Sequence, residues 1–256
     1  MDALVSGDVL LVTGVGMPLQ AMFAAVATID EYLPNRHALI GGLAVMIRVA
    51  DAHRATGDID EVAFGTEPEP AQILVDAGVA VSTSTRSTVE AGGVKIDIIA
   101  VDDYDLAELP DEGASRMFVL SHRWALDTAT PVSVGLVDHS GAVLSTTTTN
   151  VAARAALVAC KTQSSRGRRA ERGVKQASDL YDLYRLLQSD LAAGRTVVST
   201  LATAPADLGE WTLAQLRERF VDDGPSTVRM ISNLALAGPV TVDDLAGVYA
   251  AVTANR

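Results

Sequence analysis

Residues 58–64 read Asp-Ile-Asp-Glu-Val-Ala-Phe and predict a β-strand, because apolar residues recur between and after the acidic ones. Successive side chains leave a strand on opposite faces, so Asp58 and Asp60 share one face. Two neighbouring carboxylates repel each other unless a cation lies between them, and such hard oxygen ligands suit Mg²⁺. Pairs of this kind also occur on solvated surfaces, so the surrounding sequence has to decide between the two interpretations.

Upstream of this strand, the sequence predicts a second strand that runs directly into a helix. Residues 37–40 are the strand, Gly41-Gly42 a tight turn and residues 43–52 a strongly apolar helix. A strand, a glycine turn and a helix in this order can bring backbone N–H groups up to a phosphate.

Helical and strand patterns alternate through the first hundred residues. Such alternation predicts a mixed α/β sheet with packed helices, that is, an α/β (α+β) fold. The expected elements are helices over 19–33 and 70–77 and a strand over 93–101.

The second half has a different character. Two more short apolar runs, at 117–120 and 131–137, predict strands, and the chain after them is mostly helical. We therefore expect a catalytic core over residues 1–125 and a mostly helical C-terminal lobe over 126–256. The expected helices of that lobe cover 151–163, 178–192, 212–220 and 242–252.

Composition excludes several classes of protein. The single cysteine rules out an internal disulfide, and four scattered histidines show no zinc-ligand spacing. The absence of a possible internal disulfide fits a reducing, cytoplasmic location. The uncharged run over 9–29 is broken by glycine and proline and has acidic flanks, so we expect a buried strand and helix and no membrane partner.

The net charge of −12 argues against a protein that coats nucleic acid, but the charges are unevenly distributed. Residues 1–150 hold 7 Lys and Arg against 21 Asp and Glu, and residues 151–256 hold 13 against 11. This asymmetry suits a carboxylate metal site in one part of the chain and phosphate binding in the other.

Taken in order, Gly41-Gly42, Asp58-Ile59-Asp60 and Asp97 in Lys-Ile-Asp-Ile-Ile resemble the pattern of the DNA polymerase β-like nucleotidyltransferase superfamily. Two departures are visible: the spacing from Gly42 to Asp58 is slightly long, and the second small residue is Gly rather than Ser. The resemblance implies that Asp58, Asp60 and Asp97 hold catalytic Mg²⁺.

Further motifs resemble the AbiEii/AbiGii-type (MenT-like) nucleotidyltransferase toxins of that superfamily. The segment 53–60, His-Arg-Ala-Thr-Gly-Asp-Ile-Asp, is one of them. A helix carrying Lys161 and a later helix with Asp179 and Asp182 in an Asp-x-x-Asp arrangement are the others. By this resemblance, Lys161 and Asp179 join the catalytic residues, and the nucleotide-binding residues are Gly41, Gly42, Arg54, Thr56 and Lys161.

The resemblance also implies a reaction. An acceptor hydroxyl attacks the α-phosphate of a nucleoside triphosphate, pyrophosphate leaves, and two Mg²⁺ stabilise the attacking and departing oxygens. In the toxin branch the acceptor is the 3′ end of a tRNA, and a cognate antitoxin protein neutralises the enzyme.

Between Lys161 and Lys175 lies a basic run with six basic residues and one acidic residue. Basic runs are commonly just solvated, but this one run holds six of the chain's 20 Lys and Arg residues. We expect the run to be a mobile loop that binds nucleotide or RNA phosphates through Arg166, Arg168, Arg169 and Arg172.

Two other functions stay open at this point. One is a nucleotidyltransferase of the same superfamily that modifies a small molecule such as an aminoglycoside. The other is a non-catalytic nucleotide-binding module, against which the three acids weigh.

Overall fold

The computed structural model describes residues 9–13, 18–33, 36–83, 85–105, 108–166, 173–193, 197–234 and 237–254. The chain divides into two compact units. The sheet unit is Met1–Asp103 with Ala125–Ala153, and the helical unit is Tyr104–Trp124 with Arg154–Arg256. This division differs from the expected single boundary after residue 125, because the chain passes from one unit to the other three times.

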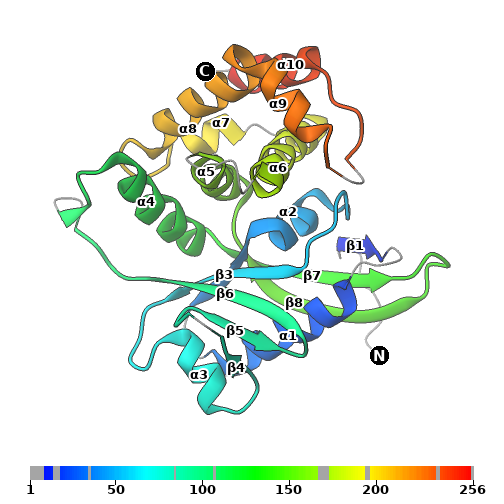
Figure 1. The fold of residues 1–256 in the computed structure, drawn as a ribbon, viewed down its shortest axis with the longest axis vertical. Coiled ribbons are helices and arrows are strands. Elements are labelled where there is room, and N and C mark those ends of the chain that lie inside the picture. The colour runs from blue at the N-terminus through cyan, green and yellow to red at the C-terminus, as the bar shows by residue number, and fades with distance from the viewer. Residues whose placement is uncertain are drawn as a thin grey trace. The chain divides into compact units, whose positions relative to one another are not determined.

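The sheet unit is built on a mixed sheet of eight strands within the described residues (Figure 1). Three neighbouring pairs are parallel, namely β1 (Val9–Val12) with β7 (Thr130–Val137), β2 (His37–Ile40) with β8 (Val143–Val151) and β3 (Asp58–Phe64) with β6 (Val94–Val101). The other pairs are antiparallel. The expected α/β class is therefore confirmed. In spatial order the strands are β1 (Val9–Val12), β7 (Thr130–Val137), β8 (Val143–Val151), β2 (His37–Ile40), β3 (Asp58–Phe64), β6 (Val94–Val101), β5 (Thr88–Ala91) and β4 (Val81–Ser82).

Three helices pack on this sheet: α1 (Leu19–Tyr32), α2 (Gly41–Val49) and α3 (Pro70–Asp76). Figure 1 shows α1 and α3 on one side of the sheet and α2 on the other. The buried positions of α1 recur every three or four residues, as in Met22, Phe23, Val26 and Ile29, which is the spacing of a helix with one core-facing side. Among the described residues, no helix combines the length and the apolarity that a membrane crossing would require.

Side chains alternate along β3, so its acidic residues lie on two opposite faces of the sheet. Glu61 is 1% exposed and lies on the α1 side, where its Oε1 is 2.8 Å from Nδ1 of His37. On the same side, Thr149 donates a hydrogen bond of 3.0 Å to Asp30 of α1. Burial raises the pKa of Glu61 to about 7, although the hydrogen bond to His37 opposes this. Glu61 therefore belongs to a buried polar cluster, and only Asp58 and Asp60 face the α2 side.

The helical unit contains most of the remaining helices. Its core includes side chains of α5 (Arg154–Ser165) and α6 (Gly173–Ala192). Of these, Leu157, Val158, Leu180, Leu183 and Leu187 are at most 1% exposed. The expected helical character of the C-terminal half is confirmed from residue 154 onward. The helices are α4 (Gly113–Asp127), α5 (Arg154–Ser165), α6 (Gly173–Ala192), α7 (Val197–Leu201), α8 (Leu208–Arg217), the π-helix Glu218–Asp222, α9 (Gly224–Ile231) and α10 (Val242–Thr253).

One expected strand is a helix. Residues 117–120 lie inside α4 rather than in a strand. The buried side chains Met117, Leu120 and Trp124 are spaced by three and four residues, which is the period of a helix. The prediction was wrong because four consecutive apolar residues look alike in both structures, and only the longer spacing separates them.

Candidate active site

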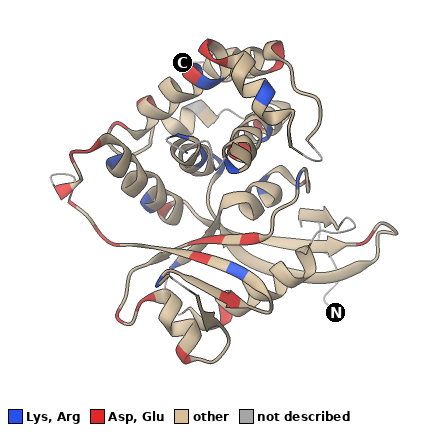
Figure 2. Ribbon diagram, viewed as in Figure 1, with Lys and Arg blue, Asp and Glu red and all other residues tan. Residues whose placement is uncertain are grey.

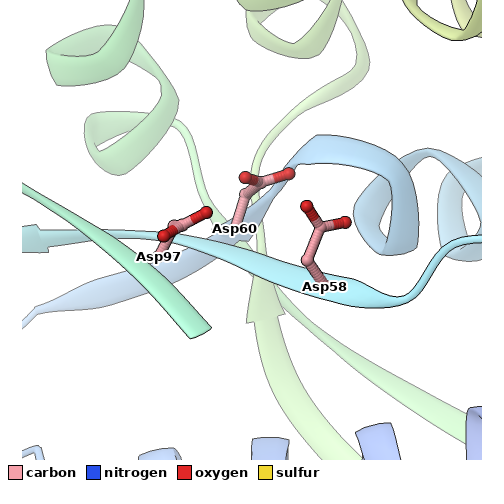
Figure 3. Close-up of side chains that lie close together, drawn as sticks. All are labelled: Asp58, Asp60 and Asp97. Carbon is pink, nitrogen blue, oxygen red and sulfur yellow. The ribbon is translucent and has the colours of Figure 1, made fainter. Parts of the chain in front are cut away.

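Strands β3 and β6 bring three aspartates together on the α2 side of the sheet. Their parallel pairing sets Asp60 directly opposite Asp97, and Asp58 lies two residues before Asp60 on the same face. One carboxylate oxygen from each residue lies within 4.8 Å of the other two, and all three side chains are half-buried (Figure 3). The expected convergence of Asp58, Asp60 and Asp97 is therefore present in the structure.

Such a cluster suits a divalent cation. Three carboxylates at this distance repel each other in the absence of a counter-charge, and several hard oxygen ligands around one point are what Mg²⁺ prefers. Acidic positions outnumber basic ones on β3 and β6, where Lys95 is the one basic residue (Figure 2), so the field on these strands is negative. The donor set fits Mg²⁺.

Neighbouring hydroxyls orient the carboxylates. Thr56 Oγ1 donates to Asp58 Oδ1 at 3.3 Å, and Thr88 Oγ1 donates to Asp97 Oδ1 at 2.6 Å. The hydroxyl of Thr88 accepts in turn from Thr85 at 2.6 Å. Hydrogen bonds of this kind fix the rotamers of ligand side chains and so support a metal site.

The sequence reasoning missed Lys95, which forms an ion pair with Asp97 Oδ2. The hydrogen bond to Asp97 raises the pKa of Lys95, although slight burial opposes it, and the charges of Asp58 and Asp60 add to the increase. The signal was present in the sequence, since Lys95 and Asp97 are two residues apart on a predicted strand and must share a face.

Gly41 allows the backbone to approach Asp60 closely. It has φ of +69°, which favours glycine, and a Cβ at this position would lie 2.0 Å from Asp60 Oδ2. Helix α2 begins at this residue, so the predicted turn is already the first residue of the helix. At Gly42 a Cβ would lie 2.5 Å from Nη2 of Arg54 and 3.0 Å from Oγ1 of Thr56. The two glycines thus bring the start of α2 against residues expected to bind nucleotide.

We expect Gly41→Ala to lower the nucleotidyl transfer that the sequence resemblance implies by at least about 10²-fold, because displacing a catalytic group by about 1 Å has costs of that size. The unfavourable φ should also cost about 1–2 kcal/mol of stability. Gly78→Ala is the matched control, since Gly78 has φ of +73° and nothing within 4 Å of its added Cβ. Thermal melts and transfer assays of both variants separate backbone strain from crowding of Asp60. Equal activity of the two variants would contradict the close approach.

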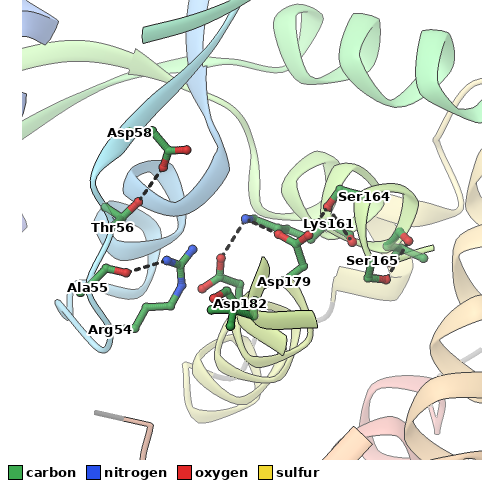
Figure 4. A network of polar contacts seen from close by, with 12 residues as sticks. Arg54, Ala55, Thr56, Asp58, Lys161, Ser164, Ser165, Asp179 and Asp182 are labelled. Atoms are coloured by element: carbon green, nitrogen blue, oxygen red, sulfur yellow. Dashed lines mark hydrogen bonds and ion pairs between the residues drawn. The ribbon is translucent and has the colours of Figure 1, made fainter. Parts of the chain in front are cut away.

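The first turn of α2 presents backbone donors. The helix has no side-chain cap at its N-terminus, where the preceding residue is Ile40. Uncapped N–H groups at a helix start, with the positive end of the helix dipole, attract phosphate. Arg54 lies next to this turn, is 8% exposed, and donates to its neighbour's carbonyl oxygen, Ala55 O, at 2.9 Å (Figure 4).

In the helical unit, Lys161 is held by two buried aspartates. Its Nζ lies 2.9 Å from Asp179 Oδ1 and 2.9 Å from Asp182 Oδ2, and Ser164 donates to Asp179 Oδ2 at 2.8 Å (Figure 4). The three charged side chains are at most 7% exposed. The structure therefore brings Lys161 together with both acids of the Asp-x-x-Asp arrangement, and these ion pairs link α5 to α6.

Of the expected RNA-binding arginines, only Arg166 is described. It is exposed, and its guanidinium carbon lies 5.8 Å from the ring centre of Trp211, which places the cation over the ring. The predictions for Arg168, Arg169 and Arg172 lie outside the described residues.

Comparisons with known proteins give only distant likenesses. No family model and no curated protein matches the sequence. Among similar solved structures, an antigenic nucleotidyltransferase-like protein from Paracoccidioides brasiliensis has 14% identity and a TM-score of 0.45, covering 82% of this chain and 93% of that one. The antibiotic-resistance factor ANT(2'')-Ia has 14% identity and a TM-score of 0.40, covering 81% and 96%. A STING-associated CdnE c-di-GMP synthase from Capnocytophaga granulosa has 8% identity and a TM-score of 0.27, covering 93% and 81%. At this distance the likenesses carry no argument, so function has to be argued from the site.

Proposed function

We propose that the protein is a Mg²⁺-dependent nucleotidyltransferase, which transfers a nucleoside monophosphate from a nucleoside triphosphate to an acceptor hydroxyl. The observation that carries this proposal is the group Asp58, Asp60 and Asp97 on one sheet face, with Gly41 at the start of α2 in van der Waals range of Asp60. A cation site and a phosphate-binding helix start side by side are what a triphosphate with its metal requires.

Each acid has a role in this proposal. Asp58 and Asp60 would bind metal jointly, and Asp97 would bind the metal next to the acceptor and accept the acceptor's proton. Bound Mg²⁺ would neutralise the triphosphate and favour the alkoxide form of the acceptor. Thr56 and Thr88 keep the carboxylates of Asp58 and Asp97 oriented through their hydrogen bonds.

The triphosphate would bind at the start of α2. Backbone N–H groups at Gly41 and Gly42 would donate to the phosphate oxygens, and Arg54 would neutralise the charge that develops as pyrophosphate leaves. Thr56 would contribute a hydroxyl where Gly42 offers none. The family resemblance further implies that Lys161 and Asp179 contribute to catalysis.

For the acceptor we propose the 3′ end of a tRNA, with Arg166 among its phosphate contacts, and a cognate antitoxin as the protein partner. The support is the resemblance of segments 53–60 and of the Lys161 and Asp179 helices to the toxin branch. The exposed guanidinium of Arg166 on Trp211 is compatible with nucleic-acid binding, since both side chains can stack on bases.

The test is a transfer assay with total tRNA, each of the four α-labelled nucleoside triphosphates and Mg²⁺. We expect label in tRNA with at least one nucleotide, none with EDTA, and none on tRNA whose 3′-terminal ribose has been oxidised with periodate. Label on an aminoglycoside but not on tRNA would assign the small-molecule function. Nucleotide binding without transfer to any acceptor would indicate the non-catalytic module and overturn the proposal.

A further inference from the structure

Lys95 lies among acidic residues on the α2 side of the sheet. The strand register places it opposite Asp58 on β3 and opposite Glu90 on β5, and Asp97 follows two residues later on the same face. Its side chain is 54% exposed, so the ammonium reaches the acids from solvent rather than from the core. The chain itself therefore supplies a cation, the Lys95 ammonium, beside the carboxylate cluster.

Both oxygens of Asp97 are engaged by this chain. Thr88 donates to Oδ1, and Lys95 holds Oδ2. The Thr88 hydroxyl is neutral and can share its oxygen with a metal, because a carboxylate oxygen accepts more than one partner. An ammonium and a divalent cation on the same carboxylate repel each other, so Lys95 and the metal compete.

We propose that Lys95 is a positioning residue that holds Asp97 in the metal-free protein and competes with the divalent cation for it. This rests on the proposed metal site of the transferase. The Lys95 ammonium offsets part of the repulsion among the three carboxylates before the site is loaded, and its competition makes the Asp97 position a weak site for metal alone. Triphosphate oxygens would then favour loading, since they give the displaced ammonium a new partner.

The test measures the binding of Mn²⁺ in the absence of nucleotide. Binding is followed by isothermal titration calorimetry and by the loss of the electron paramagnetic resonance signal of free Mn²⁺. Mn²⁺ is chosen because it accepts the same oxygen ligands as Mg²⁺ and can be detected directly. We expect Lys95→Met to bind Mn²⁺ about tenfold more tightly than wild type, because a nearby positive charge is removed while solvent screens part of its effect. Lys95→Arg should stay near wild type.

Lys175→Met is the matched control, because it removes the same charge from an exposed position on α6. Its Mn²⁺ affinity should equal that of wild type. Without metal, Lys95→Met should melt below wild type, and saturating Mn²⁺ should raise its melting temperature more than that of wild type. Lys95→Gln repeats the measurement with a polar side chain in case the methionine variant folds poorly.

Unchanged or weaker Mn²⁺ binding in both Lys95→Met and Lys95→Gln overturns the competition, provided that wild type binds the ion. Failure of wild type and of both variants to bind Mn²⁺ overturns the metal site as well, and with it the proposed function. Tighter binding in both variants, with Lys175→Met unchanged, supports the competition whatever the acceptor proves to be.

Discussion

Asp60→Asn abolishes nucleotidyl transfer and leaves the protein folded; this is the result that we expect from the carboxylate cluster. Asn keeps the shape of the side chain but loses the charge that binds Mg²⁺. Loss of several kcal/mol of transition-state stabilisation corresponds to a decrease on the order of 10³-fold or more in rate. Removal of one clustered acid also relieves repulsion, so the metal-free variant should be at least as stable as wild type.

The measurement pairs the transfer assay with thermal melts in the presence and absence of Mg²⁺ and nucleotide. Wild type should gain stability from the ligands, and Asp60→Asn should gain much less. Asp103→Asn is the control, because Asp103 is an exposed acid outside the cluster. Retained transfer by Asp60→Asn would overturn the mechanism, and a metal-free variant that melts well below wild type would assign Asp60 a structural role.

The second large effect that we expect is a loss of stability of the helical unit when Lys161 is replaced. Lys161→Met removes the cation from two buried ion pairs, those with Asp179 and Asp182, and both carboxylates are at most 2% exposed. Removing one partner of a buried ion pair costs about 3–5 kcal/mol, because the attraction that offset the desolvation of the remaining charge is lost. We therefore expect the helical unit to unfold at much lower denaturant concentration than in wild type.

A matched set of variants separates this structural role from catalysis. Lys161→Met combined with Asp179→Asn and Asp182→Asn should recover much of the lost stability, because no uncompensated charge from this group stays buried. Lys175→Met should unfold like wild type. Denaturant unfolding followed by circular dichroism measures all of them. If Lys161→Met unfolds like wild type yet loses transfer, Lys161 is catalytic rather than structural.

Local patterns were enough to predict much of the sheet unit. The alternation in residues 58–64 placed Asp58 and Asp60 on one face, and the glycine pair marked where β2 passes into α2. Both follow from backbone geometry within a few residues, which is why a single sequence reveals them. The convergence of Asp97 depended on the family resemblance, because pairing between distant strands leaves no local signal.

Other features needed the three-dimensional structure. The insertion of β7 and β8 between β1 and β2 brings together residues more than a hundred positions apart, such as Val9 and Val134. The hydrogen bond between His37 and Glu61 likewise joins two strands, and no sequence pattern next to either residue predicts it. Lys95 was not predicted as a site residue for a different reason. Its place on the same strand face as Asp97 was predictable, but lysines on strands are commonly solvated, so the sequence did not indicate that Lys95 pairs with Asp97.

The passage of the chain between units sets an order for folding during synthesis. The helical unit contains Tyr104–Trp124, but the rest of that unit begins only at Arg154. N-terminal segments emerge from the ribosome first. The hairpin β7–β8 can therefore complete the sheet before the later helices that pack with residues 104–124 have been synthesised. A fragment that stops at residue 103 would leave β1 without β7, its strand neighbour in the described sheet. A released fragment that ends at residue 153 should therefore carry a complete sheet unit, with residues 104–124 lacking the later part of their own unit, Arg154–Arg256.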